Sequence, residues 1–107
     1  MKEENIICAC SAYNRKFWFN PRFSDLPKAV QDELRVMSVL FTEDVGGIII
    51  FGYDEAGTLR IETNTQADDY NYDTIGSRLK VDDMKRKHEE LFAQLGLYYD
   101  LMKRSDG

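Results

Sequence analysis

The chain has 107 residues, a length typical of one domain, and we expect residues 1–107 to form a single folded unit. Hydrophobic residues make up 43% of the sequence and aromatic residues 12%, so this composition excludes a disordered chain. The formal net charge is −5, which argues against nucleic acid or an anionic membrane surface as a partner.

A β-hairpin is predicted over residues 5–20. Its first strand covers Ile6–Tyr13, and the aromatic run Phe17–Phe19 favours a returning strand because aromatic side chains suit a pleated surface. Between the strands, Asn14 tolerates the positive φ that a tight turn requires. Pro21 closes the hairpin, since proline cannot donate a hydrogen bond to a β-ladder.

The two cysteines, Cys8 and Cys10, lie two residues apart in the first predicted strand, where their side chains share a face. That geometry does not suit a disulfide. The cysteines and the one histidine supply at most three ligands, whereas a structural zinc site needs four. We therefore expect two buried thiols in a cytoplasmic protein, with no bound metal and no cofactor.

A helix is predicted over residues 26–43. Apolar residues recur along it at helical spacing: Val30, Leu34, Met37 and Phe41. Further apolar residues widen this face, which indicates that the helix is buried against a sheet. The Gly46-Gly47 pair marks the end of the helix.

A second hairpin is predicted over residues 47–63. The segment Ile48–Phe51 is apolar on both faces and therefore predicts a central strand. The loop Asp54–Gly57 places glycine where a hairpin turn needs positive φ. In the returning strand Leu59 and Ile61 alternate with charged residues, which leaves one face in water. No apolar run is long enough to span a membrane.

An irregular acidic stretch follows over residues 64–76, and its acidic and tyrosine residues are Asp68, Asp69, Tyr70, Tyr72 and Asp73. An Asp-x-Asn-x-Asp pattern copies the first ligand positions of a calcium loop. The pattern then has Thr74 where glycine is required and Lys80 where a bidentate glutamate is required, which argues against calcium. Two interpretations stay open: a solvated loop, or a polar lip that contacts a small ligand or a partner.

One long helix is predicted from Asp82 to Arg104. Its apolar seam repeats alternately every four and three residues: Met84, His88, Leu91, Leu95, Tyr98 and Met102. A helix of about 23 residues is roughly 34 Å long, whereas a domain of this size has a radius of gyration of about 13 Å. The helix therefore spans or overhangs the domain, and we expect its seam to serve packing or self-association as a homodimer.

Groups capable of catalysis are few and scattered. His88 is the only histidine, and its place on an apolar seam favours a packed or interface residue. The neighbouring carboxylates Glu43 and Asp44 fit a solvated helix end better than an acid–base pair. We therefore assign no catalytic residue. An enzyme is left as an alternative that would need these groups, or a cysteine, to meet in one cleft.

Three segments resemble a family of small uncharacterised bacterial proteins of about 110 residues: Phe17–Asn20, Leu40–Ile48 and Tyr72–Ser77. The resemblance covers nearly the whole chain and implies no particular activity. The order of the elements is also similar, more distantly, to part of the roadblock- and longin-type domains. That likeness implies a dimeric platform for small GTPases or protein complexes, but fold does not determine function.

The sequence thus predicts an α+β fold: a four- to five-stranded antiparallel sheet built from two hairpins, with one central helix and one long C-terminal helix. We expect helices 26–43 and 80–103 to cover one face; the alternative is one helix on each face. The first functional hypothesis is a non-catalytic interaction or regulatory module that forms a homodimer through its C-terminal helix. The alternatives are a binding domain that uses the lip at 64–76 and a small enzyme.

Overall fold

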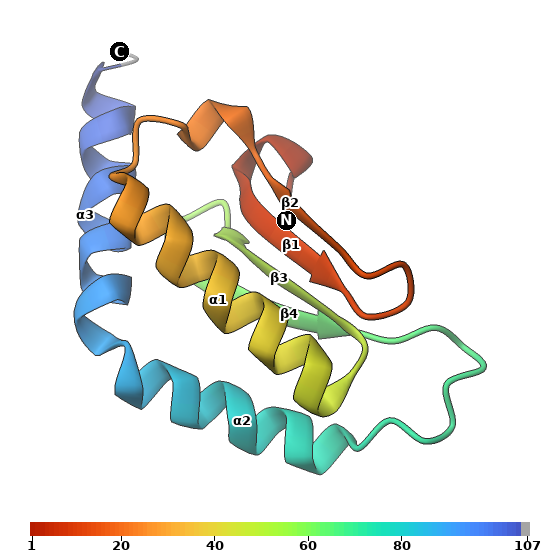
Figure 1. Ribbon diagram of the computed structural model, residues 1–107. Coiled ribbons are helices and arrows are strands. Elements are labelled where there is room, and N and C mark those ends of the chain that lie inside the picture. Colours follow the sequence, from red (N-terminus) through yellow and green to blue (C-terminus); the bar gives the residue numbers. More distant parts are fainter. Residues whose placement is uncertain (106–107) are drawn as a thin grey trace.

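The computed structural model describes residues 1–105 and contains, within that range, a four-stranded antiparallel sheet and three α-helices (Figure 1). The strands are β1 (Ile6–Ser11), β2 (Lys16–Phe19), β3 (Ile48–Tyr53) and β4 (Leu59–Asn64). The helices are α1 (Lys28–Val45), α2 (Thr74–Lys87) and α3 (Glu89–Ser105), with 3₁₀ helices at Glu3–Asn5 and Pro21–Phe23. The predicted α+β fold is confirmed, with four strands in the sheet.

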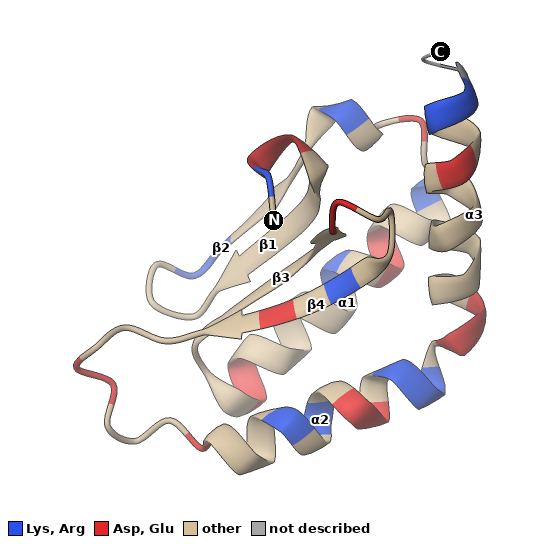
Figure 2. Cartoon of the chain, turned by 180° about the vertical axis from the view of Figure 1, so that it is seen from behind, with Lys and Arg blue, Asp and Glu red and all other residues tan. Residues whose placement is uncertain are grey.

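The two predicted hairpins join into one sheet with the strand order β2-β1-β3-β4. The central strands β1 and β3 are antiparallel, with Ala9 opposite Ile50, so β3 is central as its apolar sequence predicted. The helices lie on one face of the sheet, and Figure 2 shows the opposite face from behind, with no helix across it. The structure thus has the first of the two predicted layer arrangements.

The single helix predicted over residues 80–103 is wrong in one respect: the chain turns at His88. The backbone there leaves helical geometry (φ −120°, ψ 31°), and α3 continues in a different direction for 17 residues (Figure 1). His88 Nδ1 lies 2.8 Å from Glu33 Oε1, which ties this corner to α1. The turn lets α2 pack along α1 while α3 reaches the sheet, where the ring of Phe92 lies against that of Phe51.

The start of α2 is set by a side chain. The Asp73 carboxylate accepts a hydrogen bond from the Gly76 N–H over 2.9 Å, which satisfies one of the unpaired donors at the first turn. The helix therefore begins at Thr74, several residues before the predicted start.

One core of buried side chains connects the sheet to all three helices. Its centre includes Tyr53 of β3, which is 0% exposed. The Tyr53 hydroxyl donates a hydrogen bond to the Leu95 carbonyl over 2.6 Å, and its ring lies 4.5 Å from that of Tyr99. Tyr53 thereby joins the central sheet to α3 through both a buried hydrogen bond and an aromatic contact.

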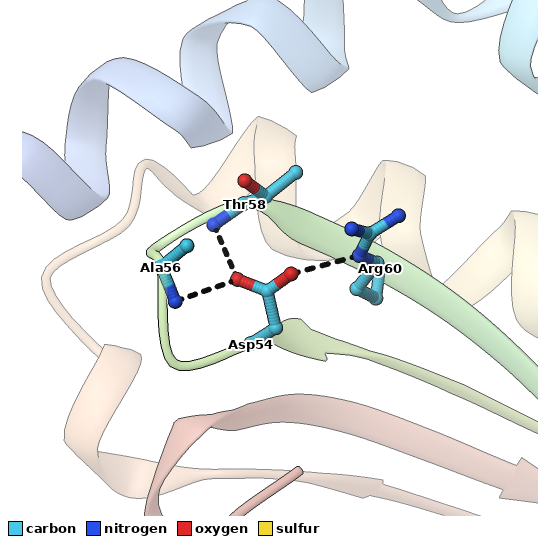
Figure 3. A network of polar contacts seen from close by, with 4 residues as sticks. All are labelled: Asp54, Ala56, Thr58 and Arg60. Carbon is cyan, nitrogen blue, oxygen red and sulfur yellow. Dashed lines mark hydrogen bonds and ion pairs between the residues drawn. The ribbon is translucent and has the colours of Figure 1, made fainter.

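The turn between β3 and β4 is held by Asp54 (Figure 3). Its Oδ1 accepts hydrogen bonds from the N–H groups of Ala56 (2.9 Å) and Thr58 (3.0 Å), and its Oδ2 accepts one from Arg60 Nε (2.8 Å). Gly57 has the expected positive φ of 82°. The Arg60 hydrogen bond, followed by the backbone N–H groups, holds the pKa of Asp54 below its usual value.

We expect Asp54→Asn to lower the melting temperature at neutral pH and to lose this effect in acid. Because the pKa of Asp54 is depressed in the folded chain, its stabilising contribution is present above the unfolded-state pKa and is lost as pH falls through the native pKa. Melting curves of the wild type and of Asp54→Asn, recorded from neutral to acidic pH, test the prediction. The control is Asp82→Asn on the exposed side of α2. A melting-temperature difference that did not change with pH would contradict it.

Candidate functional site

A cavity of about 550 Å³ opens between the β1–β2 hairpin and α1. Its lining combines residues from the hairpin and its turn with residues from α1: Arg15, Lys16, Phe17, Arg35, Val39, Thr42 and Glu43. Its volume is within the range of small-molecule sites. The cavity therefore joins two segments that are distant in the sequence into one concave surface.

The inner wall of this cavity is formed where β1 meets α1. Cys10 Sγ lies 3.4 Å from Thr42 Oγ1, and both residues are almost fully buried. Cys8, two residues earlier in β1, is 0% exposed, and burial raises the pKa of its thiol to about 12. Both cysteines are free and buried, as the sequence predicted. Cys8 is therefore a neutral thiol at ordinary pH.

Most of the predicted polar lip is occupied by contacts within the chain. Asp69 Oδ2 accepts a hydrogen bond from the Tyr13 hydroxyl over 2.6 Å, and this tyrosine, which sequence reasoning missed, ties the acidic stretch to the first hairpin. The Tyr72 hydroxyl lies 2.6 Å from Ser77 Oγ, and Asp73 caps α2. Asp68 and Tyr70 point into solvent, with Tyr70 89% exposed. The lip stays a prediction, with these last two residues as its accessible members.

The predicted apolar seam faces the interior of the chain. Met84, Leu91 and Leu95 belong to the buried core, and the remaining three members pack partly buried against it or at the corner: His88, Tyr98 and Met102. The seam is thus the packing face of α2 and α3. The structure describes one copy of the chain, in which this face is largely covered.

The opposite side of α3 carries a second stripe, which we call the outer stripe: Glu90, Gln94, Leu97, Leu101 and Arg104. All five side chains are exposed, and the two leucines are 65% and 61% exposed. Their spacing, alternately four and three residues, repeats that of the seam. This spacing was the signal that sequence reasoning could have used, but the more apolar seam masked it.

The groups considered for catalysis lie on two sides of α1. His88 and Asp44 line a groove of about 210 Å³ between α1 and α2, where Lys80 pairs with Asp44. Cys10 and Glu43 line the cavity beside the hairpin.

Within residues 1–105, no three His, Cys, Asp or Glu side chains form a cluster that could hold a metal ion. None of the described helices combines the length and the apolar character that crossing a membrane requires.

Comparison with known proteins identifies a family without identifying an activity. A family model described as a family of unknown function (DUF6145) matches residues 4–106. This match confirms the predicted resemblance to a family of small proteins of unknown function. No curated protein and no solved structure matches the chain, so the likeness to roadblock- and longin-type domains gains no support.

Proposed function

We propose that this chain, which belongs to the DUF6145 family of unknown function, is a non-catalytic interaction module that pairs with a second copy of itself through α3. The observation that carries the proposal is the outer stripe, because exposed leucines at this spacing are typical of a helix that packs on another helix. The two free, buried thiols support a cytoplasmic location, where cysteines stay reduced.

The charges on the outer stripe favour a second copy as its partner. Glu90 precedes Leu97 by seven residues, and Arg104 follows it by seven. In an antiparallel pair of α3 helices, a twofold axis at Leu97 therefore brings Glu90 of each copy opposite Arg104 of the other. Opposite charges at both ends fix the register and orientation of such a pair.

Side-chain size supports the same register. Ala93 precedes Leu97 by four residues, and Leu101 follows it by four, so the twofold axis sets a small side chain opposite a large one. Such alternation lets facing helices interdigitate. A helix of 17 residues offers a contact about 25 Å long. One helix pair of that length buries an area at the low end of the range for specific interfaces. We therefore expect a weak dimer that dissociates in the micromolar range.

Sedimentation velocity over a range of micromolar concentrations tests the proposal. The mass of the wild-type chain should rise with concentration toward that of a dimer. Leu97→Glu should stay monomeric, because dimerisation would bury a carboxylate at the twofold axis. The matched control is Leu79→Glu on α2, since Leu79 is 63% exposed. A wild-type chain that stays monomeric throughout, or a dimer dissolved by Leu79→Glu and not by Leu97→Glu, would overturn the proposal.

A charge exchange tests the register directly. Glu90→Arg and Arg104→Glu should each weaken the dimer, because each places like charges at both ends of the helix pair. An equimolar mixture of the two variants should recover association, because in a mixed pair an arginine faces a glutamate at both ends. Failure of the mixture to associate better than either variant alone would rule out this register.

A further inference from the structure

The cavity beside the first hairpin has a charge opposite to that of the whole chain. We call it the cationic cavity and define it by Arg15, Lys16, Phe17, Arg35 and Thr42. Three of these side chains are positive and Glu43 is the one acidic residue of the lining, whereas the chain as a whole carries −5. The local excess of positive charge is therefore built by the packing of the hairpin on α1.

The cations of the cavity are not engaged in ion pairs. Within the described residues no carboxylate pairs with Arg15, Lys16 or Arg35, although the chain has 19 acidic and 14 basic residues. Carboxylates do pair with other cations on the surface: Arg60, Lys80, Arg86 and Lys87. All three cations line the same cavity, so an anion bound there would interact with each of them.

The turn that carries Arg15 is strained. Arg15 has φ 52°, and within residues 1–105 it is the one residue other than glycine with positive φ; the sequence had placed this conformation at Asn14. For an arginine the left-handed conformation is sterically unfavourable. Such strain is found where the surroundings hold a residue in place for a task. Here the conformation belongs to the turn whose residues line the mouth of the cavity.

The walls of the cavity suit a flat apolar group next to the anion. The Arg35 guanidinium lies over the Phe17 ring, 6.0 Å from its centroid, so a planar cation and an aromatic face line the same space. Val39 adds an apolar side, and the Thr42 hydroxyl lies on the inner wall. A ligand with a ring and an acidic group would thus meet complementary surfaces.

We propose that the cationic cavity binds a small organic phosphate, with the phosphate held by Arg15, Lys16 and Arg35 and its organic part against Phe17 and Val39. Three positive charges and Glu43 leave a net local charge of about +2, which matches a phosphate monoester of about −2 at neutral pH. Arginine forks also bind phosphate oxygens in pairs. The proposal is independent of self-association, because the outer stripe lies on α3.

Titration of the ¹⁵N-labelled chain with phenyl phosphate tests the proposal. Amide shifts should concentrate on residues 15–17 and 35–43, and phenol, which lacks the charge, should not produce them. Arg35→Gln should weaken binding about tenfold, because it removes one charged hydrogen-bond donor. The matched control is Arg78→Gln on the exposed side of α2, which removes the same charge away from the cavity and should leave the affinity unchanged.

Two further variants keep the result interpretable. Arg15→Asn removes a positive charge from the cavity and should weaken binding about tenfold. Because asparagine adopts positive φ more readily than arginine, the same change should not lower the melting temperature. Leu97→Glu should bind phenyl phosphate as the wild type does, which separates this site from the dimer. Shifts spread over surface cations in general, or an affinity unaffected by Arg35→Gln, would overturn the proposal.

Discussion

Tyr53→Ala is expected to lower the free energy of unfolding by about 4 kcal/mol. Tyr53 is 0% exposed, and its ring packs between those of Tyr99 (4.5 Å) and Phe23 (5.9 Å), so truncation opens a cavity at the junction of β3 and α3. The same change removes the hydrogen bond to the Leu95 carbonyl. Unfolding in urea, followed by circular dichroism, measures the loss.

Two variants separate the parts of this effect. Tyr53→Phe keeps the ring and removes the hydroxyl, so it should cost about 1 kcal/mol, the usual net value of a hydrogen bond. Tyr70→Ala removes a tyrosine that is 89% exposed and should leave stability unchanged. If Tyr53→Ala cost no more than Tyr53→Phe, the ring would not join α3 to the sheet as described.

Gly47→Ala is expected to lower the free energy of unfolding by about 3 kcal/mol, through backbone strain and overpacking together. Gly47 has φ 70°, a conformation that alanine adopts at a cost. A Cβ atom there would also lie 2.9 Å from the Asn64 carbonyl oxygen and 2.7 Å from the Tyr72 ring. The backbone oxygen belongs to β4 and cannot move aside without disturbing the strand pair.

Gly96→Ala is the control, with the opposite expected sign. Gly96 lies within α3, and nothing is within 4 Å of the position that its Cβ would take. Alanine there should raise stability by about 0.5–1 kcal/mol, because it lowers the entropy cost of forming the helix. A loss below about 1 kcal/mol for Gly47→Ala would show that β3 and β4 can separate at this end to admit a methyl group.

The sheet could be predicted because its signals are local. Alternation of apolar and charged residues in β4 and the two-sided apolar sequence of β3 follow directly from the geometry of edge and central strands. The turn at Asp54–Gly57 could be predicted for the same reason. Its glycine adopts positive φ, and its aspartate side chain accepts a hydrogen bond from the backbone of the turn.

The corner at His88 could not be predicted from the same kind of pattern. The apolar repeat continues through it without interruption, because α2 and α3 bury the same seam on either side. No glycine or proline marks the break. The observed support is a contact with Glu33, a residue of another helix, and such tertiary contacts leave no trace in the local sequence.

The candidate sites depend on tertiary packing even more strongly. The cationic cavity exists because α1 crosses the sheet beside the β1–β2 turn, which brings Arg35 to Phe17. In the sequence these residues are ordinary surface charges and a strand aromatic. The acidic stretch shows the reverse case: Tyr72 and Asp73 looked accessible, but the fold uses them to anchor and cap α2.

The corner at His88 also sets the rotational phase of α3. It consists of a single residue between α2 and α3, so every added or deleted residue there would turn the whole of α3 by about 100° about its axis. Leu91 and Leu95 would leave the core, and Leu97 would no longer point outward. The length of this joint is therefore tied to the placement of both faces of the last helix.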